Sequence, residues 1–518
     1  MTENDSAATD EIPGGAEEEQ PHESTNNPLL PAHEPVNEDL PTELELEATE
    51  RLVAFLKKHD CYESDERSAK RQEVLDELQG IGNEFVRRAA VQNNIPVEID
   101  GKPIQCLISH FGSFRLGVCS PSSDIDCLCI TPKFIKRSNF FSIMYDLLNK
   151  NPKVSGLQKI ENAFVPILTM TYDTIDIDIS FAALDLDTIP SDIDLSDDTI
   201  LNNLDTQAWS SINGVRTNDM LLQLVPNLES FRDLLRFIRI WSKKRAIYGN
   251  VYGYLGGVNC ALLAAFICQR YPLATSSKLV QMFFHDLMEW PWPAPIYINT
   301  PNVGPIDSWD PETSPDVMPI ITPAYPVINS IRSASVSTRH RMVEEFKLGY
   351  KLTTIIINKK RKWDKLLAET NFFTRYKYYI QIKISADTQE NYDSWQGTVE
   401  SKIKRLAMDL EKEENIQYAV TFPYTFPTHE GGKEFAGSFF IGMVFKKPSD
   451  PNQKLSIDVT TPTQSFLTFL MKQTNKTAPM LVEPSLIKRQ DVPLYVFPNG
   501  ERPPPKKPKA NKKAKKAK

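Results

Sequence analysis

Aspartates in two separate segments of the sequence could converge on one metal site. Asp124 and Asp126 lie two positions apart in Ser-Ser-Asp-Ile-Asp, and Asp176 and Asp178 alternate with three isoleucines further along the chain. Successive side chains of a β-strand point to opposite faces, so the two aspartates of each segment share a face about 7 Å apart, while the isoleucines point into the core. If the two strands are neighbours, three or four carboxylates gather at one patch.

Such a cluster predicts divalent cations. Carboxylates this close repel one another, and a multivalent cation removes the repulsion. Carboxylate oxygens are typical ligands of Mg²⁺ and Mn²⁺. We therefore expect Mg²⁺ or Mn²⁺ as two ions about 3.5–4 Å apart, one activating a hydroxyl and the other holding a phosphate leaving group.

A Gly-Ser pair, Gly112-Ser113, precedes the first aspartate by eleven residues. Glycine lets the backbone approach a ligand closely, and the turn that follows can present N–H groups and a hydroxyl to phosphate oxygens, in front of the positive end of a helix dipole. Either motif alone is common on ordinary surfaces, and Asp192-Ile193-Asp194, with no Gly-Ser before it, is interpreted as an exposed turn. Together, the two motifs predict attack of a hydroxyl on the α-phosphate of a nucleotide.

The segments that carry these motifs predict a mixed α/β domain. Apolar residues recur at helical spacing between residues 43 and 94, and strand patterns follow. We expect strands over 105–110, 125–130, 167–171 and 175–181, and a helix over 138–150.

The remainder of the chain predicts a helical domain and then a second α/β domain. The strongest helix, over 230–245, has one apolar stripe formed by Phe231, Leu234, Leu235, Ile238 and Trp241. A proline-rich interval over 290–326 interrupts regular structure. We then expect a strand over 378–384, a helix over 395–410, strands over 439–445 and 455–459, and a short helix through Phe466 and Leu470. This order is typical of a βαββα sandwich of the RNA-recognition type, although the RNP1 aromatic signature is absent.

The formal charge of −8 conceals two tails of opposite sign. Residues 1–50 carry 15 acidic side chains and no Lys or Arg, whereas residues 501–518 carry nine basic side chains and one acidic side chain. We expect a disordered acidic tail over 1–42 and a basic disordered tail over 499–518. The basic tail is interpreted as a nuclear-import signal that also binds RNA without sequence preference, and a solubilising tail with no specific role is the alternative.

Seven cysteines without a CxxC motif indicate a reduced intracellular protein. Cys127 and Cys129 interrupt a strand pattern and are interpreted as core residues, not as metal ligands. The longest apolar stretch, near Val258 to Cys268, is far shorter than a membrane span, and no basic-then-apolar leader opens the sequence. We therefore expect a soluble protein without membrane contact.

Gly112-Ser113, Asp124-x-Asp126 and the later Asp178 resemble the nucleotidyltransferase superfamily of the DNA polymerase beta type. Six segments resemble one branch of it, the nuclear eukaryotic poly(A) polymerases, and the likeness extends over residues 50 to 498. The segments are Phe111 to Val118, Ala163 to Ile167, Asn213-Gly214-x-Arg216, Ile240-Trp241-x-Lys243-x-Arg245, Tyr248-x-Asn250 to Val258, and Met318 to Pro326. The resemblance implies template-independent addition of AMP from ATP to the 3′ end of (pre-)mRNA, with release of pyrophosphate by a two-metal mechanism.

The resemblance also implies the residues of the site. Asp124, Asp126 and Asp178 are the expected catalytic and metal-binding triad, and Asp176 is the alternative to Asp178. The expected nucleotide contacts are Phe111, Gly112, Ser113, Ser120, Phe164, Asn213, Arg239, Lys243, Tyr248, Asn250, Gly257, Val258 and Thr322. Phe164 and Val258 would offer apolar walls to a base. Ordinary core and loop packing is the alternative explanation for these positions.

An α+β multidomain fold follows from the same resemblance. We expect a mixed α/β nucleotidyltransferase domain over 43–204, a helical central domain over 205–353 and an RRM-like RNA-binding domain over 354–498. The first helices of the chain can pack on the central domain. The candidate phosphate contacts of the RNA-binding domain are Lys402, Lys404, Arg405, Lys446 and Lys447.

Basic residues recur along the helix over 230–245. Arg232, Arg236, Arg239 and Lys243 lie at steps of four, three and four and predict a basic ridge. A solvated face is the usual explanation of such a ridge, but this one leads into the Tyr248 motif, so we expect Arg239 or Lys243 to contact the triphosphate. The family usually has lysine at position 239, and its loop before the first aspartate usually contains glycine, which Cys119 to Ser123 lacks.

The implied partners are ATP, an RNA 3′ end and subunits of the cleavage and polyadenylation complex. The implied setting is a monomeric catalytic subunit in the nucleus. Two alternatives remain open. A terminal uridylyl- or CCA-adding transferase would share the triad and prefer another nucleotide, and a catalytically silent RNA-binding subunit of the 3′-end-processing complex would not need all three carboxylates.

Overall fold

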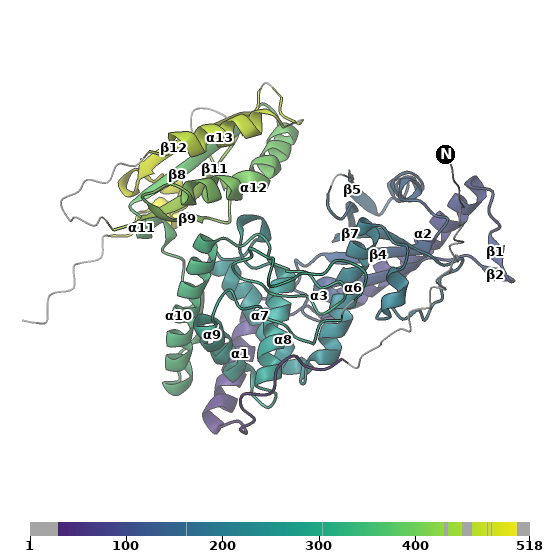
Figure 1. Cartoon of the computed structure of the whole chain (residues 1–518), viewed down its shortest axis with the longest axis horizontal. Helices are drawn as coiled ribbons and strands as arrows, with labels where there is room; N and C mark the ends of the chain where they lie inside the picture. Colours follow the sequence, from purple (N-terminus) through teal and green to yellow (C-terminus); the bar gives the residue numbers. More distant parts are fainter. Residues whose placement is uncertain are drawn as a thin grey trace, which may run out of the picture.

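The computed structural model describes residues 29–161, 163–302, 304–428, 434–447, 458–473, 475–477 and 479–504. The acidic tail up to residue 28, residues 455–457 of a predicted strand and the basic tail from residue 505 lie outside these ranges. Figure 1 shows a sheet containing β4 and β7 at one end, a helical part in the middle, and a second sheet with α12 and α13 at the other end. The predicted α+β multidomain fold is confirmed.

The first sheet has five strands in the order β3-β4-β7-β6-β5. The strands are β3 (Leu107–Phe111), β4 (Ile125–Pro132), β7 (Ile175–Leu184), β6 (Ile167–Tyr172) and β5 (Val154–Ile160). β4 and β7 are parallel, and the other pairs are antiparallel. The four predicted strands are confirmed. The edge strand β5 was missed because most of its side chains face solvent and give no apolar pattern.

Side-chain alternation divides the residues of β4 between two cores. Ile125, Cys127 and Cys129 pack beneath α2 (Asp65–Gln92), whereas Leu128 and Ile130 belong to the core that includes α6 (Thr206–Leu224). Both cysteines are fully buried, so their interpretation as core residues is confirmed. The remaining short elements are β1 (Glu98–Ile99), β2 (Lys102–Pro103), α3 (Gly112–Arg115), α4 (Arg137–Asn139), the π-helix η1 (Phe140–Met144), α5 (Tyr145–Asn149) and η2 (Asp198–Leu201).

The helical part lies beside the α6 face of this sheet. It contains α1 (Glu43–Lys58), α7 (Leu228–Lys244), α8 (Gly257–Arg270), α9 (Ser276–Glu289) and α10 (Val336–Asn358), with the short helices η3 (Asn250–Tyr252) and η4 (Trp363–Leu367). α1 packs against α9 and α10, so the first two helices of the chain join different cores. Asn227 caps α7, which begins two residues before its predicted start. Within the described residues, no helix is long and apolar enough to cross a membrane.

Residues 29–42 run along the helical part. Pro31 forms an isolated β-bridge with Asn299, and the Val36 amide donates to the Arg270 carbonyl at 2.8 Å. The His33 ring meets the edge of Phe266 at a centroid distance of 5.2 Å. These contacts differ from the expectation that the chain is disordered up to residue 42. Apolar and aromatic surface on the helices gives this stretch a place to pack, which its own composition does not reveal.

The second sheet is antiparallel, in the order β10-β11-β8-β12, and β9 also pairs with β11. Its elements are α11 (Phe372–Arg375), β8 (Tyr378–Ala386), α12 (Gln389–Glu411), β9 (Ile416–Thr421), β10 (Phe426–Pro427), β11 (Phe435–Phe445), α13 (Thr460–Met471), β12 (Leu481–Lys488), η6 (Arg489–Asp491), η7 (Leu494–Val496) and η8 (Pro498–Gly500). β9 and β12 were not predicted. Pro484 inside β12 weakens its strand pattern, as expected for an edge strand.

Aromatic side chains cover the face of the second sheet that does not meet α12 and α13. Phe373, Tyr379, Phe440 and Phe497 belong to one buried cluster on that face. In RNA-recognition sheets, exposed aromatic side chains on this face stack on bases. Here the protein's own residues cover this face, so the aromatic side chains of this cluster are not exposed for bases to stack on, which agrees with the missing RNP1 signature.

Candidate active site

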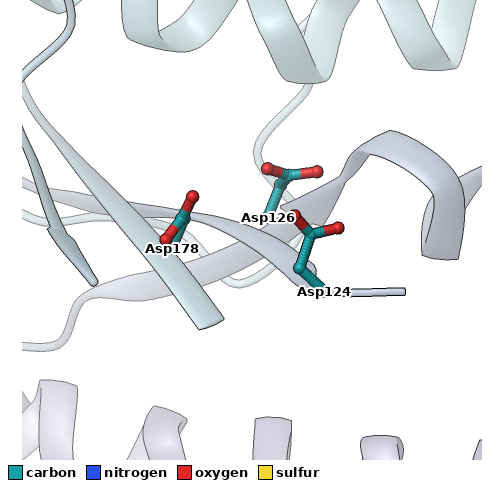
Figure 2. A group of neighbouring side chains, drawn as sticks. All are labelled: Asp124, Asp126 and Asp178. Carbon is teal, nitrogen blue, oxygen red and sulfur yellow. The ribbon is translucent and has the colours of Figure 1, made fainter. Parts of the chain in front are cut away.

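Three aspartates from two strands converge at the end of the first sheet. Asp126 and Asp178 are direct neighbours in the parallel pairing of β4 with β7, and Asp124 stands one residue before β4 begins. One carboxylate oxygen from each residue lies within 4.8 Å of the other two. Figure 2 shows the three side chains next to one another. The Asp176 carboxylate lies outside this cluster and accepts a hydrogen bond from the Thr171 hydroxyl at 2.7 Å.

The surroundings disfavour negative charge on two of these carboxylates. Burial and the charges of Asp124 and Asp178 raise the pKa of Asp126 to about 7, and Arg239 opposes the shift. Burial also raises the pKa of Asp178, with a hydrogen bond from Thr169 acting in the opposite direction. A divalent cation would remove this electrostatic cost. The cluster therefore has the number of oxygen donors, the spacing and the charge that suit a metal ion.

Gly112 lies directly against this cluster. Its φ of +68° is in the left-handed region that favours glycine, and an added Cβ would collide with Oδ2 of Asp126. Ser113 follows in the single-turn helix α3, where its hydroxyl lies 3.6 Å from the Cys119 sulfur. Glycine is thus the residue type that lets the Gly-Ser turn touch the carboxylates.

A cavity of about 490 Å³ opens between the sheet and the helical part, beside the aspartates. Eleven residues named from the sequence line it: Phe111, Gly112, Ser113, Asp124, Asp126, Asn213, Arg239, Tyr248, Gly257, Val258 and Thr322. Its volume is within the range of small-molecule sites in proteins. Asp124 and Asp126 line the cavity, and so do apolar residues such as Leu221 and Ala261.

Comparison with known proteins identifies the family. Models of the poly(A) polymerase nucleotidyltransferase domain, central domain and predicted RNA binding domain match residues 33–225, 230–369 and 371–436. The poly(A) polymerase PAPalpha of Candida albicans is 35% identical over 419 residues, which cover 79% of this chain and 73% of that relative. The chain belongs to the poly(A) polymerase family. The resemblance found in the sequence motifs is confirmed.

Two other members of the poly(A) polymerase family are each 36% identical to this chain. They are the poly(A) polymerase of Dictyostelium discoideum and nuclear poly(A) polymerase 1 of Arabidopsis thaliana, which align over 93% and 91% of it. The chain spans 61% and 66% of the length of those two relatives. A solved structure of a poly(U) polymerase is 15% identical to this chain, and the alignment covers 63% of this chain and 99% of that structure. Its TM-score of 0.42 is too low to bear on function.

Five of the residues named from the sequence are not in the cavity lining. Asp178 belongs to the carboxylate cluster, and Ser120 is bound within its own turn, where its hydroxyl lies 3.1 Å from that of Ser123. Phe164 is 68% exposed on the loop after β5. The Lys243 ammonium lies 5.1 Å from the Tyr248 ring centroid, and Asn250 accepts a hydrogen bond from Ser333.

The basic ridge of α7 binds the chain just after the Gly-Ser turn. Arg232, Arg236 and Arg239 donate to the consecutive carbonyls of Leu116, Gly117 and Val118, at 3.0, 2.6 and 2.9 Å. Three guanidinium groups thus hold one short loop, and the explanation of the ridge as a solvated face is wrong. Arg239 still lines the cavity, so it combines this contact with a place beside the predicted triphosphate position.

Motif reading missed one wall of the cavity. Ser210, Gly214, Thr217, Asn218 and Leu221 of α6 line it together with the predicted Asn213. Their steps of three and four residues mark one face of a helix. This spacing is visible in the sequence, but only the packing of α6 against β3 and β4 shows that the face is turned to the cavity.

Proposed function

We propose that this chain is a template-independent polymerase that adds AMP from ATP to the 3′ end of RNA and releases pyrophosphate. One observation carries the proposal: three carboxylates from separate segments meet beside Gly112-Ser113, and two of them line a cavity of about 490 Å³. Membership of the poly(A) polymerase family supports the choice of reaction.

The aspartates act on the phosphate end of ATP. Asp124, Asp126 and Asp178 would hold two divalent cations, Mg²⁺ or Mn²⁺, and these would supply positive charge to the triphosphate and lower the pKa of the attacking hydroxyl. The 3′ oxygen forms a bond to the α-phosphorus, the bond from that phosphorus to the bridging oxygen of the β-phosphate breaks, and pyrophosphate leaves. The hydroxyl proton passes to solvent. Gly112 and Ser113 supply backbone N–H groups and a hydroxyl to the phosphate oxygens.

The other predicted contacts fall into two groups. Arg239 and Lys243 supply positive charge towards the triphosphate, and Phe111 and Ser120 line the same side. The nucleoside is received by the other predicted positions, which are Phe164, Asn213, Tyr248, Asn250, Gly257, Val258 and Thr322. Apolar residues in the cavity lining, such as Leu221 and Ala261, suit contact with a base.

The RNA primer would reach the site along the RRM-like domain, which we keep at residues 354–498. Because aromatic residues of the protein cover one face of its sheet, we assign RNA contact to basic side chains. Lys446, Lys447 and Arg405 are exposed, but the Arg405 guanidinium also lies 4.2 Å from the Phe469 ring centroid, and Lys404 is half-buried and donates to the Arg332 carbonyl at 3.5 Å. These contacts favour the two exposed lysines.

We also propose the cellular setting implied by the family. A nuclear location, as the name of the Arabidopsis relative suggests, and association with subunits of the cleavage and polyadenylation complex belong to this proposal. The other domain limits expected from the sequence, 43–204 and 205–353, belong to it as well.

The direct test offers the purified chain an oligo(A) primer with each nucleoside triphosphate separately, with Mg²⁺ or Mn²⁺. We expect extension with ATP, at least tenfold faster than with UTP, CTP or GTP, and none after chelation of the metal. Preference for UTP or CTP would assign the chain to another terminal transferase activity. Binding of the primer without any extension would indicate the catalytically silent subunit.

A further inference from the structure

Asp124 differs from its two partners in how its backbone is held. Asp126 and Asp178 lie within paired strands and occupy opposite positions in the β4–β7 register. Asp124 precedes the first residue of β4, and its carboxylate is the exposed one of the three. Repulsion from two neighbouring carboxylates therefore acts on a residue whose backbone lies outside the strand pairing that holds the other two.

Arg71 binds the backbone of this loop. From the second turn of α2, its Nη2 donates to the Ser123 carbonyl at 2.6 Å and more weakly to the Ser120 carbonyl at 3.5 Å. Its Nη1 reaches the Asp124 carbonyl at 3.4 Å. One guanidinium thus spans the turn that ends at Asp124.

A carboxylate fixes the guanidinium in turn. Nε of Arg71 donates to both carboxylate oxygens of Glu63, at 2.8 and 3.0 Å. The Arg71 side chain is fully buried, and that of Glu63 is 6% exposed. A buried charge is stable only when it is paired and its donors are used, so the Glu63–Arg71 pair resists displacement from the loop.

Arg71 acts on the backbone and not on the carboxylates. Among the described residues, Glu63 is the only carboxylate that forms an ion pair with it. Ile125, the residue after Asp124, packs in the same core as Val74 and Leu75 of α2. α2 thus supports the loop from the face of the sheet opposite to the carboxylates.

We propose that Arg71 is a positioning residue of the metal site. It holds the backbone of Ser120 to Asp124 so that the Asp124 carboxylate stays beside Asp126 and Asp178 against their repulsion, and Glu63 keeps Arg71 in place. This inference rests on the proposed function, because it assigns the carboxylates to a divalent cation. Arg71 lies outside the cavity lining, so its effect is on metal binding and on the rate of transfer rather than on nucleotide binding.

The variant Arg71→Lys separates charge from geometry. Lysine keeps the positive charge but carries its donors on one atom, so it cannot bind Glu63 and the carbonyls of the turn together. Glu63→Gln leaves Arg71 and its donors in place and keeps an oxygen that accepts from Nε, but it removes the negative charge that pairs with the buried guanidinium. Arg341→Lys is the matched control: Arg341 is also buried and pairs with Glu345 at 2.6 Å, but it lies on α10, away from the loop.

The first readout is Mn²⁺ binding without nucleotide, followed by the electron paramagnetic resonance signal of free Mn²⁺. Arg71→Lys is expected to raise the midpoint of the titration, which is the Mn²⁺ concentration at half-saturation, about tenfold or more. Loss of a residue that supports a metal ligand typically weakens metal binding by this factor. Glu63→Gln is expected to raise it about two- to fivefold, since the charge-assisted hydrogen bond is weakened. Arg341→Lys should keep the wild-type midpoint even if it melts at a lower temperature.

The second readout is AMP transfer. In Arg71→Lys, kcat should fall about tenfold or more while KM for ATP changes little. If Arg71→Lys folds and keeps the wild-type midpoint for Mn²⁺ and the wild-type kcat, the inference is overturned. If Arg71→Lys does not fold, a wild-type midpoint for Mn²⁺ in Glu63→Gln overturns it. If wild-type protein neither binds Mn²⁺ nor transfers AMP, the proposed function itself fails. That result concerns the wild-type protein and is therefore distinct from the outcomes for the variants.

Discussion

At the scale of single residues, the site depends on the environment of Asp126. Burial and two neighbouring carboxylates raise its pKa to about 7, so near neutral pH a proton competes with any cation for this group. The two aspartate pairs could be found from the sequence, because alternation with isoleucine is a local pattern. Which of Asp176 and Asp178 joins the cluster could not be derived from that pattern alone, since both lie on the same face of β7.

The raised pKa of Asp126 predicts pH-dependent metal binding. Below about pH 7 the carboxyl group is protonated and the cation must displace the proton, whereas above it the carboxylate is already charged. The affinity for Mn²⁺ should therefore rise as the pH increases from 6 to 8, by roughly tenfold. Titration of the nucleotide-free protein with Mn²⁺ at three pH values measures this. An affinity that stays constant over the range would contradict the assignment of Asp126 as a ligand.

A second prediction at this scale concerns Gly112. Gly112→Ala places a methyl group against the Asp126 carboxylate and demands a left-handed conformation that costs alanine about 1–2 kcal/mol. We expect AMP transfer to fall by about a hundredfold or more with a small change in melting temperature. The control is Gly101→Ala, which also has positive φ (+70°) but open space around the added atom. Similar activities of the two variants would show that the contact with Asp126 is unimportant.

For helices and strands, local sequence patterns predicted the type of each element better than the elements against which it packs. The alternation of β4 and β7 and the apolar stripe of α7 were visible because they repeat within a few residues. Helical spacing over 43–94 could not show that α1 and α2 join different cores. The arginines of α7 were visible as a ridge, but their carbonyl partners lie more than a hundred residues earlier in the chain, beyond the reach of any local pattern.

The arginine contacts of α7 lead to a prediction at this scale. Arg232→Met leaves the carbonyl of Leu116 without its donor, at a cost of about 1–3 kcal/mol, and loosens the loop that follows Ser113. We expect KM for ATP to rise about three- to tenfold. Steady-state kinetics check this against Arg87→Met, which removes an exposed arginine of α2. An unchanged KM in Arg232→Met would mean that the loop does not need this contact.

At the scale of the whole molecule, the cavity is a product of tertiary packing. Its walls come from the first sheet, from α6, α7 and α8, and from the segment around residues 322–330. The domain of the second sheet contacts the helical part, because Tyr254 donates to the Thr421 carbonyl at 2.7 Å and Tyr424 donates to the Lys243 carbonyl at 2.8 Å. Family resemblance named eleven residues of the cavity lining, whereas the α6 face and these links between domains required coordinates.

The central claim is that Asp178, together with Asp124 and Asp126, holds the cations for AMP transfer. The most direct measurement compares Asp178→Asn with Asp176→Asn, two changes on the same face of one strand. We expect Asp178→Asn to lower ATP-dependent primer extension by about a thousandfold or more and to weaken Mn²⁺ binding, while Asp176→Asn keeps both near the wild-type values. Extension that survives in Asp178→Asn, or is lost instead in Asp176→Asn, would contradict the account.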